Sequence, residues 1–149
     1  MLEDAVARFQ RMGADGYVDE TRARVAECLA LAGRTAEARS VADETLVHVR
    51  REAETSVLDA QLERTLGWSA LLDDDREAAR THVERSLAVG RSLKAEFEVA
   101  LTLRALIAAS DDPEERRAAE DESARTLASL GVVAVAEPVP AVRSEAVAG

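Results

Sequence analysis

Small and apolar residues recur at helical spacing on both sides of one polar break near the middle of the chain. They are Leu62, Leu66, Ser69 and Leu72 before the break, and Ala79, Val83, Ser86 and Leu87 after it. The break itself, Asp73–Asp75, is too polar to be buried. Because a period of about 3.6 residues marks a helix that buries one face, the stretch predicts a helix, a tight turn and a second helix. Small residues stand where the two helices must touch.

The same periodicity predicts an all-α chain of about seven helices plus an extended C-terminal tail. The expected helix ranges are 2–12, 18–32, 36–53, 56–72, 76–91, 95–109 and 113–131. Gly13, Asp15 and Gly16 are expected to end the first helix, and Gly33 to cap the second in the left-handed conformation. The sixth helix is apolar on most sides, which predicts that it is buried among its neighbours.

Three of the expected hairpins repeat one spacing of small residues. Ala38, Ala79 and Ala119 stand near the start of the second helices and lie 41 and 40 positions apart. A further small or medium-sized residue follows each alanine four positions later. Small side chains at these places let the two helices of a hairpin approach closely. The repetition therefore predicts a stack of similar hairpins.

The repeated pattern resembles the tetratricopeptide repeat, a helical hairpin with small residues at its crossing points. Gly33 stands where the turn glycine of that repeat belongs, five positions before Ala38. Gly67 and Ala79 match its small positions, and Val83 matches a large one. The resemblance implies antiparallel hairpin repeats in a right-handed solenoid, with a concave groove lined by the first helix of each pair. The chain departs from the family in its longer repeat, about 40 residues instead of about 34, and in the missing closing proline.

Stretched repeats of this kind resemble the C-terminal parts of large bacterial signalling proteins, of the nucleotide-cyclase type and the LuxR type. The ending Leu130-Gly131-Val132-Val133, followed by Pro138, is similar to the close of those chains. The resemblance implies a regulatory, non-catalytic module for protein–protein interaction or scaffolding. Its expected partner is a protein or peptide, including another domain of the parent chain.

A helical-repeat domain is expected over residues 1–131, with a half-repeat (1–16) and three hairpins (17–53, 54–93 and 94–131). The apolar side of the first helix needs cover, since its hairpin partner is missing from the pattern. This side is formed by Leu2, Val6, Phe9 and Met12. We expect it to pack on the second helix and to leave apolar surface for a homodimer contact.

The tail, 132–149, begins with a valine run whose composition favours aggregation if it is left free. We expect its first part to pack over the last hairpin, with Val132, Val133 and Val135 against Leu106, Leu127 and Leu130. In the rival interpretation the run adds to the groove of a neighbouring molecule. The end of the tail is weakly patterned and expected to be mobile.

Composition narrows the function classes. Hydrophobic residues make up 47% of the chain but aromatic residues only 3%, so the core must be aliphatic, which favours close helix packing over a β-sandwich. With 19 basic and 29 acidic residues, the net charge of −10 argues against nucleic-acid binding. No apolar run reaches membrane length, and the single cysteine, Cys28, suits a reducing compartment. We therefore expect a cytoplasmic protein and interpret Cys28 as a small core residue.

No constellation of residues predicts catalysis, and neither a cofactor nor a metal is expected. The two histidines, His48 and His82, lie on separate helices, whereas a zinc site needs several converging ligands. The acidic Asp73–Asp75 lacks the ligand spacing of an EF-hand. Asp75 is instead expected to cap the following helix, as is Asp112 before Pro113.

The candidate binding residues follow from the resemblance, since the first helix of each pair lines the groove in the repeat family. Counting from the anchor alanines places Glu20, Ala23 and Ala108 there. It also places there the five residues that we take as binding candidates: Glu27, Arg64, Trp68, Leu101 and Arg104. An exposed tryptophan flanked by arginines is typical of a binding hot spot. Trp68 could instead fill the aliphatic core. The alternative function is a small-ligand sensor that binds between helices 56–72 and 95–109.

Overall fold

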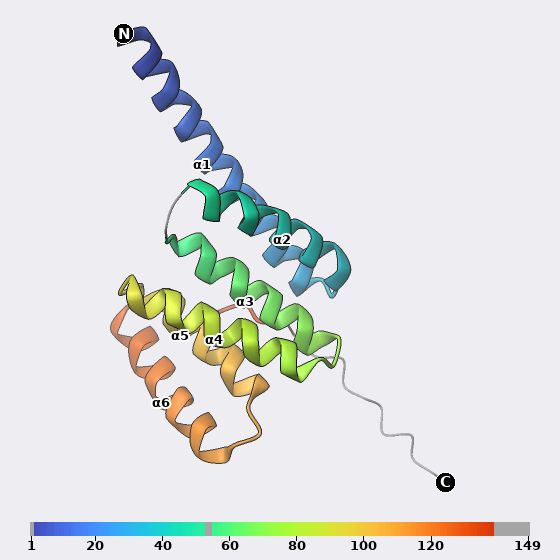
Figure 1. Cartoon of the computed structure of the whole chain (residues 1–149). Coiled ribbons are helices and arrows are strands. Elements are labelled where there is room, and N and C mark those ends of the chain that lie inside the picture. The colour runs from blue at the N-terminus through green and yellow to red at the C-terminus, as the bar shows by residue number, and fades with distance from the viewer. Residues whose placement is uncertain (1, 53–54, 139–149) are drawn as a thin grey trace.

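The computed structural model describes residues 2–52 and 55–138, with the helical backbone alone at residues 2–10 and 12. Six helices and no strand lie within these ranges (Figure 1). They are α1 (Leu2–Leu31), α2 (Thr35–Glu52), α3 (Val57–Leu72), α4 (Arg76–Ser92), α5 (Glu96–Ala109) and α6 (Pro113–Ser129). The predicted all-α class is confirmed. None of the described helices combines the length and the apolar composition that crossing a bilayer demands.

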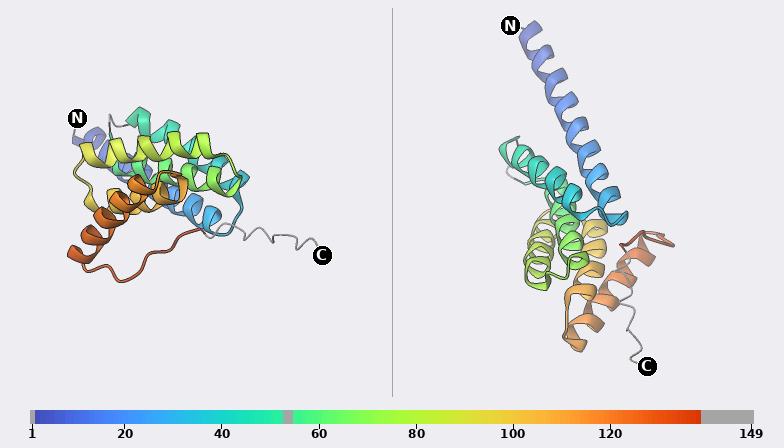
Figure 2. Two further views of the ribbon diagram at one scale, coloured as in Figure 1. Left: turned by 90° about the horizontal axis from the view of Figure 1, so that it is seen from below. Right: turned by 90° about the vertical axis from the view of Figure 1, so that its right-hand side faces the viewer.

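The first helix is longer than predicted, because the expected helices 2–12 and 18–32 form the single helix α1. Gly13 and Gly16 do not end it. A glycine inside a helix costs about 1 kcal/mol relative to alanine, whereas proline removes a hydrogen bond and clashes with the preceding turn. The described ranges therefore hold six helices instead of about seven. The start of α1 extends away from the other helices in Figures 1 and 2.

The predicted contacts of the N-terminal apolar side remain untested. The side chains of Leu2, Val6, Phe9 and Met12 lie outside the described residues. Their packing and the homodimer contact therefore stay predictions. The predicted mobility of the chain end also falls outside the described residues, which stop at Pro138.

The helices pack in two layers. α3 contacts both α1 and α5, so that these three helices form one layer, and α2, α4 and α6 pack against it. Neighbours along the chain also contact each other, which gives the hairpins α1–α2, α3–α4 and α5–α6 (Figure 2). The face of the first layer that points away from α2, α4 and α6 is thus built from α1, α3 and α5.

The small residues of the predicted pattern lie at helix crossings. Ala38, Ala79 and Ala119 are all buried. Gly90, near the end of α4, allows an equally close approach to α5, since a Cβ at Gly90 would lie 3.0 Å from Cγ2 of Val99. The spacing read from the sequence therefore marks the places where the helices meet.

Four helices end in the same left-handed turn. Gly33, Asp74, Lys94 and Gly131 have φ angles of 76°, 64°, 53° and 71°. At each turn the N–H of this residue donates to the carbonyl three residues before it, and the next N–H donates to the carbonyl five residues before its own position. This is the Schellman motif, which satisfies carbonyl groups at the helix end. The cap predicted at Gly33 is confirmed.

Two helices start where aspartates were predicted to cap them. The side chain of Asp75 accepts a hydrogen bond from the Ala78 N–H at 3.0 Å. The side chain of Asp112 accepts one from the Glu114 N–H at 2.9 Å, and Pro113 occupies the first helical position. These caps hold the turns before α4 and α6 and so fix the geometry of their hairpins.

Candidate functional site

The described part of the tail crosses the face made by α1, α3 and α5. After the turn at Gly131 the chain runs back without helical structure over residues 132–138 (Figure 2). Residues 132–135 lie beside Leu127 and Arg104. Residues 136–138 reach the space between the end of α1, the middle of α3 and α5. The tail therefore covers all three hairpins and not only the last one.

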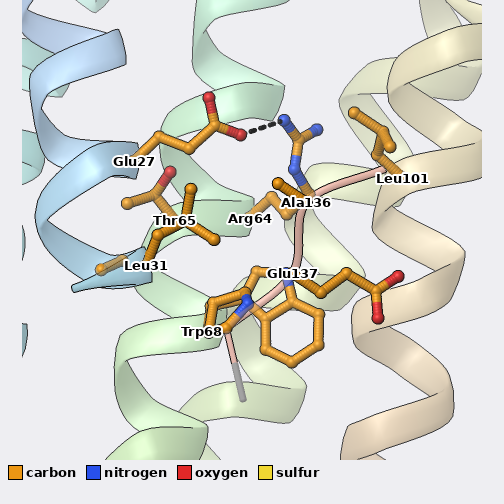
Figure 3. A pocket seen from close by; sticks show the side chains of 10 residues that line it. Glu27, Leu31, Arg64, Thr65, Trp68, Leu101, Ala136 and Glu137 are labelled. Atoms are coloured by element: carbon orange, nitrogen blue, oxygen red, sulfur yellow. Dashed lines mark hydrogen bonds and ion pairs between the residues drawn. The ribbon is translucent and has the colours of Figure 1, made fainter. Parts of the chain in front are cut away.

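All five candidate binding residues meet this segment. Glu27, Arg64, Trp68 and Leu101 surround one hollow together with Ala136, Glu137 and Pro138 (Figure 3). Arg104, one turn after Leu101 on α5, forms an ion pair with Glu137 of the tail. These five residues, which were inferred from the repeat pattern, thus lie on one face of the structure.

Trp68 is buried, as in the second of its two interpretations, in which it fills the aliphatic core. Only 8% of its surface is exposed. It belongs to a core cluster that includes Val83, Leu103 and Leu106. Its remaining surface lines the hollow beneath the tail, so the indole joins the core to the groove. Since α3 lies between α1 and α5 in their layer, a large side chain on α3 is enclosed from several sides.

Arg64 is also buried, with 4% of its surface exposed. Its guanidinium pairs with Glu98 of α5 and lies 3.5 Å from a carboxylate oxygen of Glu27 on α1. A buried cation is tolerated only with such partners, because desolvation without them would be costly. Arg64 therefore links α1, α3 and α5. Its charge is matched by carboxylates of these helices and does not need the tail.

The valine run packs only in part. Val132 and Val135 are half-buried, and the Val132 N–H donates to the Leu127 carbonyl at 2.9 Å. Val133 is 99% exposed, so the expectation that it packs over the last hairpin is wrong. Pro138 is buried. Val132 and Val135 therefore face the protein, whereas Val133 points into solvent.

The hollow beside the tail differs along its length. At Trp68 the space left under residues 136–138 measures about 20 Å³, room for about one water molecule. Next to it lies a wider hollow of about 460 Å³ between α1, α3, α5 and residues 134–136. Both charged and apolar side chains line its wall, among them Arg24, Glu98 and Phe97. Such a lining suits an extended peptide segment, which presents both kinds of group.

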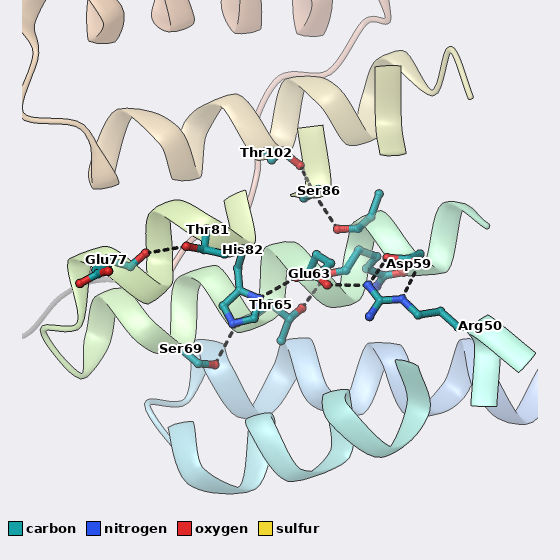
Figure 4. Close-up of polar contacts among 12 residues, drawn as sticks. Arg50, Asp59, Glu63, Thr65, Ser69, Glu77, Thr81, His82, Ser86 and Thr102 are labelled. Carbon is teal, nitrogen blue, oxygen red and sulfur yellow. Dashed lines mark hydrogen bonds and ion pairs between the residues drawn. The ribbon is translucent and has the colours of Figure 1, made fainter. Parts of the chain in front are cut away.

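A second polar cluster lies within the helices, on α2, α3 and α4 (Figure 4). Arg50 makes two bonds of 2.9 Å to Asp59 and one of 2.6 Å to Glu63. The other oxygen of Glu63 lies 2.6 Å from Nδ1 of His82. Burial raises the pKa of the Glu63 carboxyl, but the hydrogen bonds of His82 and Arg50 outweigh it and hold that pKa below its ordinary value. Both carboxylate oxygens of Glu63 are hydrogen-bonded and only 1% of its side chain is exposed. The cluster therefore holds α2, α3 and α4 together.

The sequence analysis did not predict this cluster. The available signal was a pair of carboxylates one turn apart, Asp59 and Glu63, in a helix with many apolar residues. The other histidine, His48, pairs with Asp19 of α1 at 2.6 Å. No group of three or more potential metal ligands occurs among the described residues. Cys28 is exposed on α1, which corrects its interpretation as a core residue.

Comparisons of the chain with protein-family models, with curated proteins and with solved structures find no match.

Proposed function

We propose that the chain is a non-catalytic protein-interaction module of the tetratricopeptide type, arranged as a right-handed solenoid of hairpins. In this proposal the face of α1, α3 and α5 is the concave groove, and it binds an extended segment of another protein. The observation that carries the proposal is the course of residues 132–138, which lie without helical structure along this face. A surface that accommodates one extended segment of the chain has the shape and the chemistry to accommodate another.

Two further observations support the proposal. The anchor alanines are buried at the hairpin crossings, as the repeat requires. The groove-facing register inferred from those anchors also predicted the residues that meet the tail. As the resemblance to stretched bacterial repeats suggests, we further propose a regulatory role in a larger cytoplasmic signalling protein. A reading frame that continues upstream of Met1 into a catalytic or ATPase domain would test this role.

The alternative, a small-ligand sensor, has weaker support. It requires an enclosed space between α3 and α5. At Trp68 the space under the tail has room for about one water molecule. The wider hollow beside it is lined by several charged side chains and bounded by the tail rather than by helices on all sides. Drug-sized ligands usually have most of their surface enclosed by a cavity, and this hollow is open on one side.

Selection of peptides from a random display library on the full chain tests the groove. Each selected peptide is then measured against two variants that place an arginine on different faces. Leu101→Arg blocks the groove, and the matched control Val47→Arg alters an exposed position on α2. We expect binding to wild type and to Val47→Arg, and binding at least about ten-fold weaker to Leu101→Arg, with unchanged melting temperatures. Equal binding to both variants would contradict the proposal.

A further inference from the structure

We propose that residues 132–138 act as an intramolecular pseudo-ligand, and that the partner is an extended segment of another protein that carries a carboxylate followed by proline and replaces the tail. This inference rests on the proposed function and adds to it the chemistry of the partner and a means of regulation.

The charge pattern of the groove identifies the carboxylate. Among the described residues, Arg64 has its charge matched by Glu27 and Glu98 from neighbouring helices. Arg104, in contrast, pairs with Glu137 of the tail, and the described helices offer it no ion-pair partner. When the tail leaves, Arg104 loses its counter-charge. A partner segment that restores it must place a carboxylate at the position of Glu137.

The apolar end of the groove identifies the proline. Pro138 is buried, and it lines the same hollow as Trp68, Ala30 and Leu31. A proline next to a tryptophan buries apolar surface with little loss of conformational freedom, because its ring already fixes the backbone. The residues before Glu137 are Ala134, Val135 and Ala136. Small side chains at these places let an extended backbone lie close to the helices.

The tail is attached in a way that allows release. Over residues 133–138 no hydrogen bond to the described helices is found, so side-chain packing and the Arg104–Glu137 pair hold this segment. Both side chains are partly exposed, which limits the stabilisation that the pair provides, although its Nε and Oε1 atoms are themselves buried. The tail nevertheless competes well, because its attachment to α6 gives it a high effective concentration at the groove. The apparent affinity for a partner equals the intrinsic affinity multiplied by the fraction of molecules whose groove is open.

A labelled synthetic peptide with the sequence of residues 130–140 tests this inference on the full chain. Binding is measured for wild type, for Glu137→Arg, which repels the tail from Arg104, and for Glu120→Arg. The last variant carries the same charge change at an exposed position of α6 and is the matched control. We expect Glu137→Arg to bind the peptide at least about ten-fold more tightly than wild type and control. In the double variant Arg104→Glu/Glu137→Arg, which restores the ion pair with reversed charges, the emission of Trp68 should return to that of wild type.

The fluorescence of the single tryptophan measures independently whether the tail covers the groove. Release of residues 136–138 exposes Trp68, so the emission of Glu137→Arg should shift to longer wavelength while that of Glu120→Arg does not. An unshifted emission in both Glu137→Arg and Glu137→Arg/Pro138→Gly would overturn the inference, because these residues would then not hold the tail over Trp68.

The remaining outcomes separate the inference from the proposed function. Equal peptide binding by wild type and Glu137→Arg would overturn the inference and leave a peptide-binding groove. A shifted emission without peptide binding by any variant would overturn both. A dimer of Glu137→Arg in light scattering, dissociated by the peptide, would identify a second copy as the occupant and overturn the assignment to a different partner.

Discussion

Gly67 of α3 and Val83 of α4 pack so closely that a Cβ at Gly67 would lie 3.0 Å from Cγ2 of Val83. Val83 is completely buried, so its side chain has little room to move. The carbonyl oxygen of Ala79 would lie 3.5 Å from the same Cβ. The α3–α4 hairpin is therefore joined at a point where one residue has no side chain and the facing residue is branched.

We predict that Gly67→Ala destabilises the protein by about 1–2 kcal/mol. The better helix propensity of alanine contributes about 1 kcal/mol in the opposite direction, so overpacking must exceed it. Urea denaturation measures the difference. Gly16→Ala is the control, since nothing lies within 4 Å of the position in the middle of α1. Its stability should equal or exceed that of wild type, and a stabilised Gly67→Ala would show that the crossing is not tight.

Local residue patterns were sufficient to predict the hairpins and their crossing points. Ala38, Ala79 and Ala119 each bury no more than a methyl group, and this requirement does not depend on the rest of the fold. Gly33, Asp75 and Asp112 act on their own helix ends, so their roles could also be read from the sequence. These features are local, and local preferences agree with the fold in most of the chain.

The errors concern features that depend on neighbours distant in sequence. Gly13 and Gly16 suggested a helix end, but nothing in the surroundings forces the chain to turn there. The burial of Trp68 depends on Leu103 and on tail residues more than 60 positions away. The cluster of Arg50, Glu63 and His82 joins three helices. Periodicity within one helix cannot predict such partners.

Replacing Lys94 by glycine should stabilise the protein, because at this position a residue with a Cβ is unfavourable. Lys94 adopts a φ of 53° at the left-handed end of α4, where residues with a Cβ are strained. We predict that Lys94→Gly stabilises the protein by about 0.5–1 kcal/mol, measured by urea denaturation. Gly33→Ala, at the equivalent position after α1, should lower stability by about 1 kcal/mol. If Lys94→Gly lowers stability, the turn after α4 is held by the lysine side chain and not by backbone conformation.

Stability should fall at acidic pH partly through Glu63. The folded protein holds the pKa of this carboxyl below its ordinary value, despite burial, through His82 and Arg50. Its ionised form therefore stabilises the fold above the pKa of the unfolded chain, and this contribution is lost as the pH falls through the lowered pKa. We predict that Glu63→Gln is less stable than wild type at pH 7, on the order of 3 kcal/mol, because Arg50 loses a buried partner.

The difference between wild type and Glu63→Gln should become smaller as the pH falls below about 5, measured by urea denaturation at each pH. Arg80 and Arg91 also lower the pKa values of Glu115 and Glu122, and these pairs remain in both proteins. Some acid sensitivity will therefore persist in the variant. Glu20→Gln, at an exposed position of α1, is the control and should follow wild type at every pH. A constant difference for Glu63→Gln would exclude ionised Glu63 as a source of the pH dependence.

Two valines of the tail provide a matched pair, because the same substitution at each should have different effects. Val133 is fully exposed and Val135 is half-buried beside Arg104 and Leu101. An aspartate at 135 places a charge against the groove and removes buried apolar surface, which should cost about 1 kcal/mol and release the tail. Val133→Asp should leave both stability and Trp68 emission unchanged. It should also reduce aggregation, since it interrupts the exposed valine run.

Urea denaturation followed by tryptophan emission measures both effects in one experiment, since Trp68 is the single tryptophan. In Val135→Asp the emission should already lie at longer wavelength before unfolding begins. Equal effects of the two substitutions would contradict this placement of the tail, because Val135 would then be no closer to the groove than Val133. The contrast between two residues so close in sequence thus tests the placement of the tail independently of any partner.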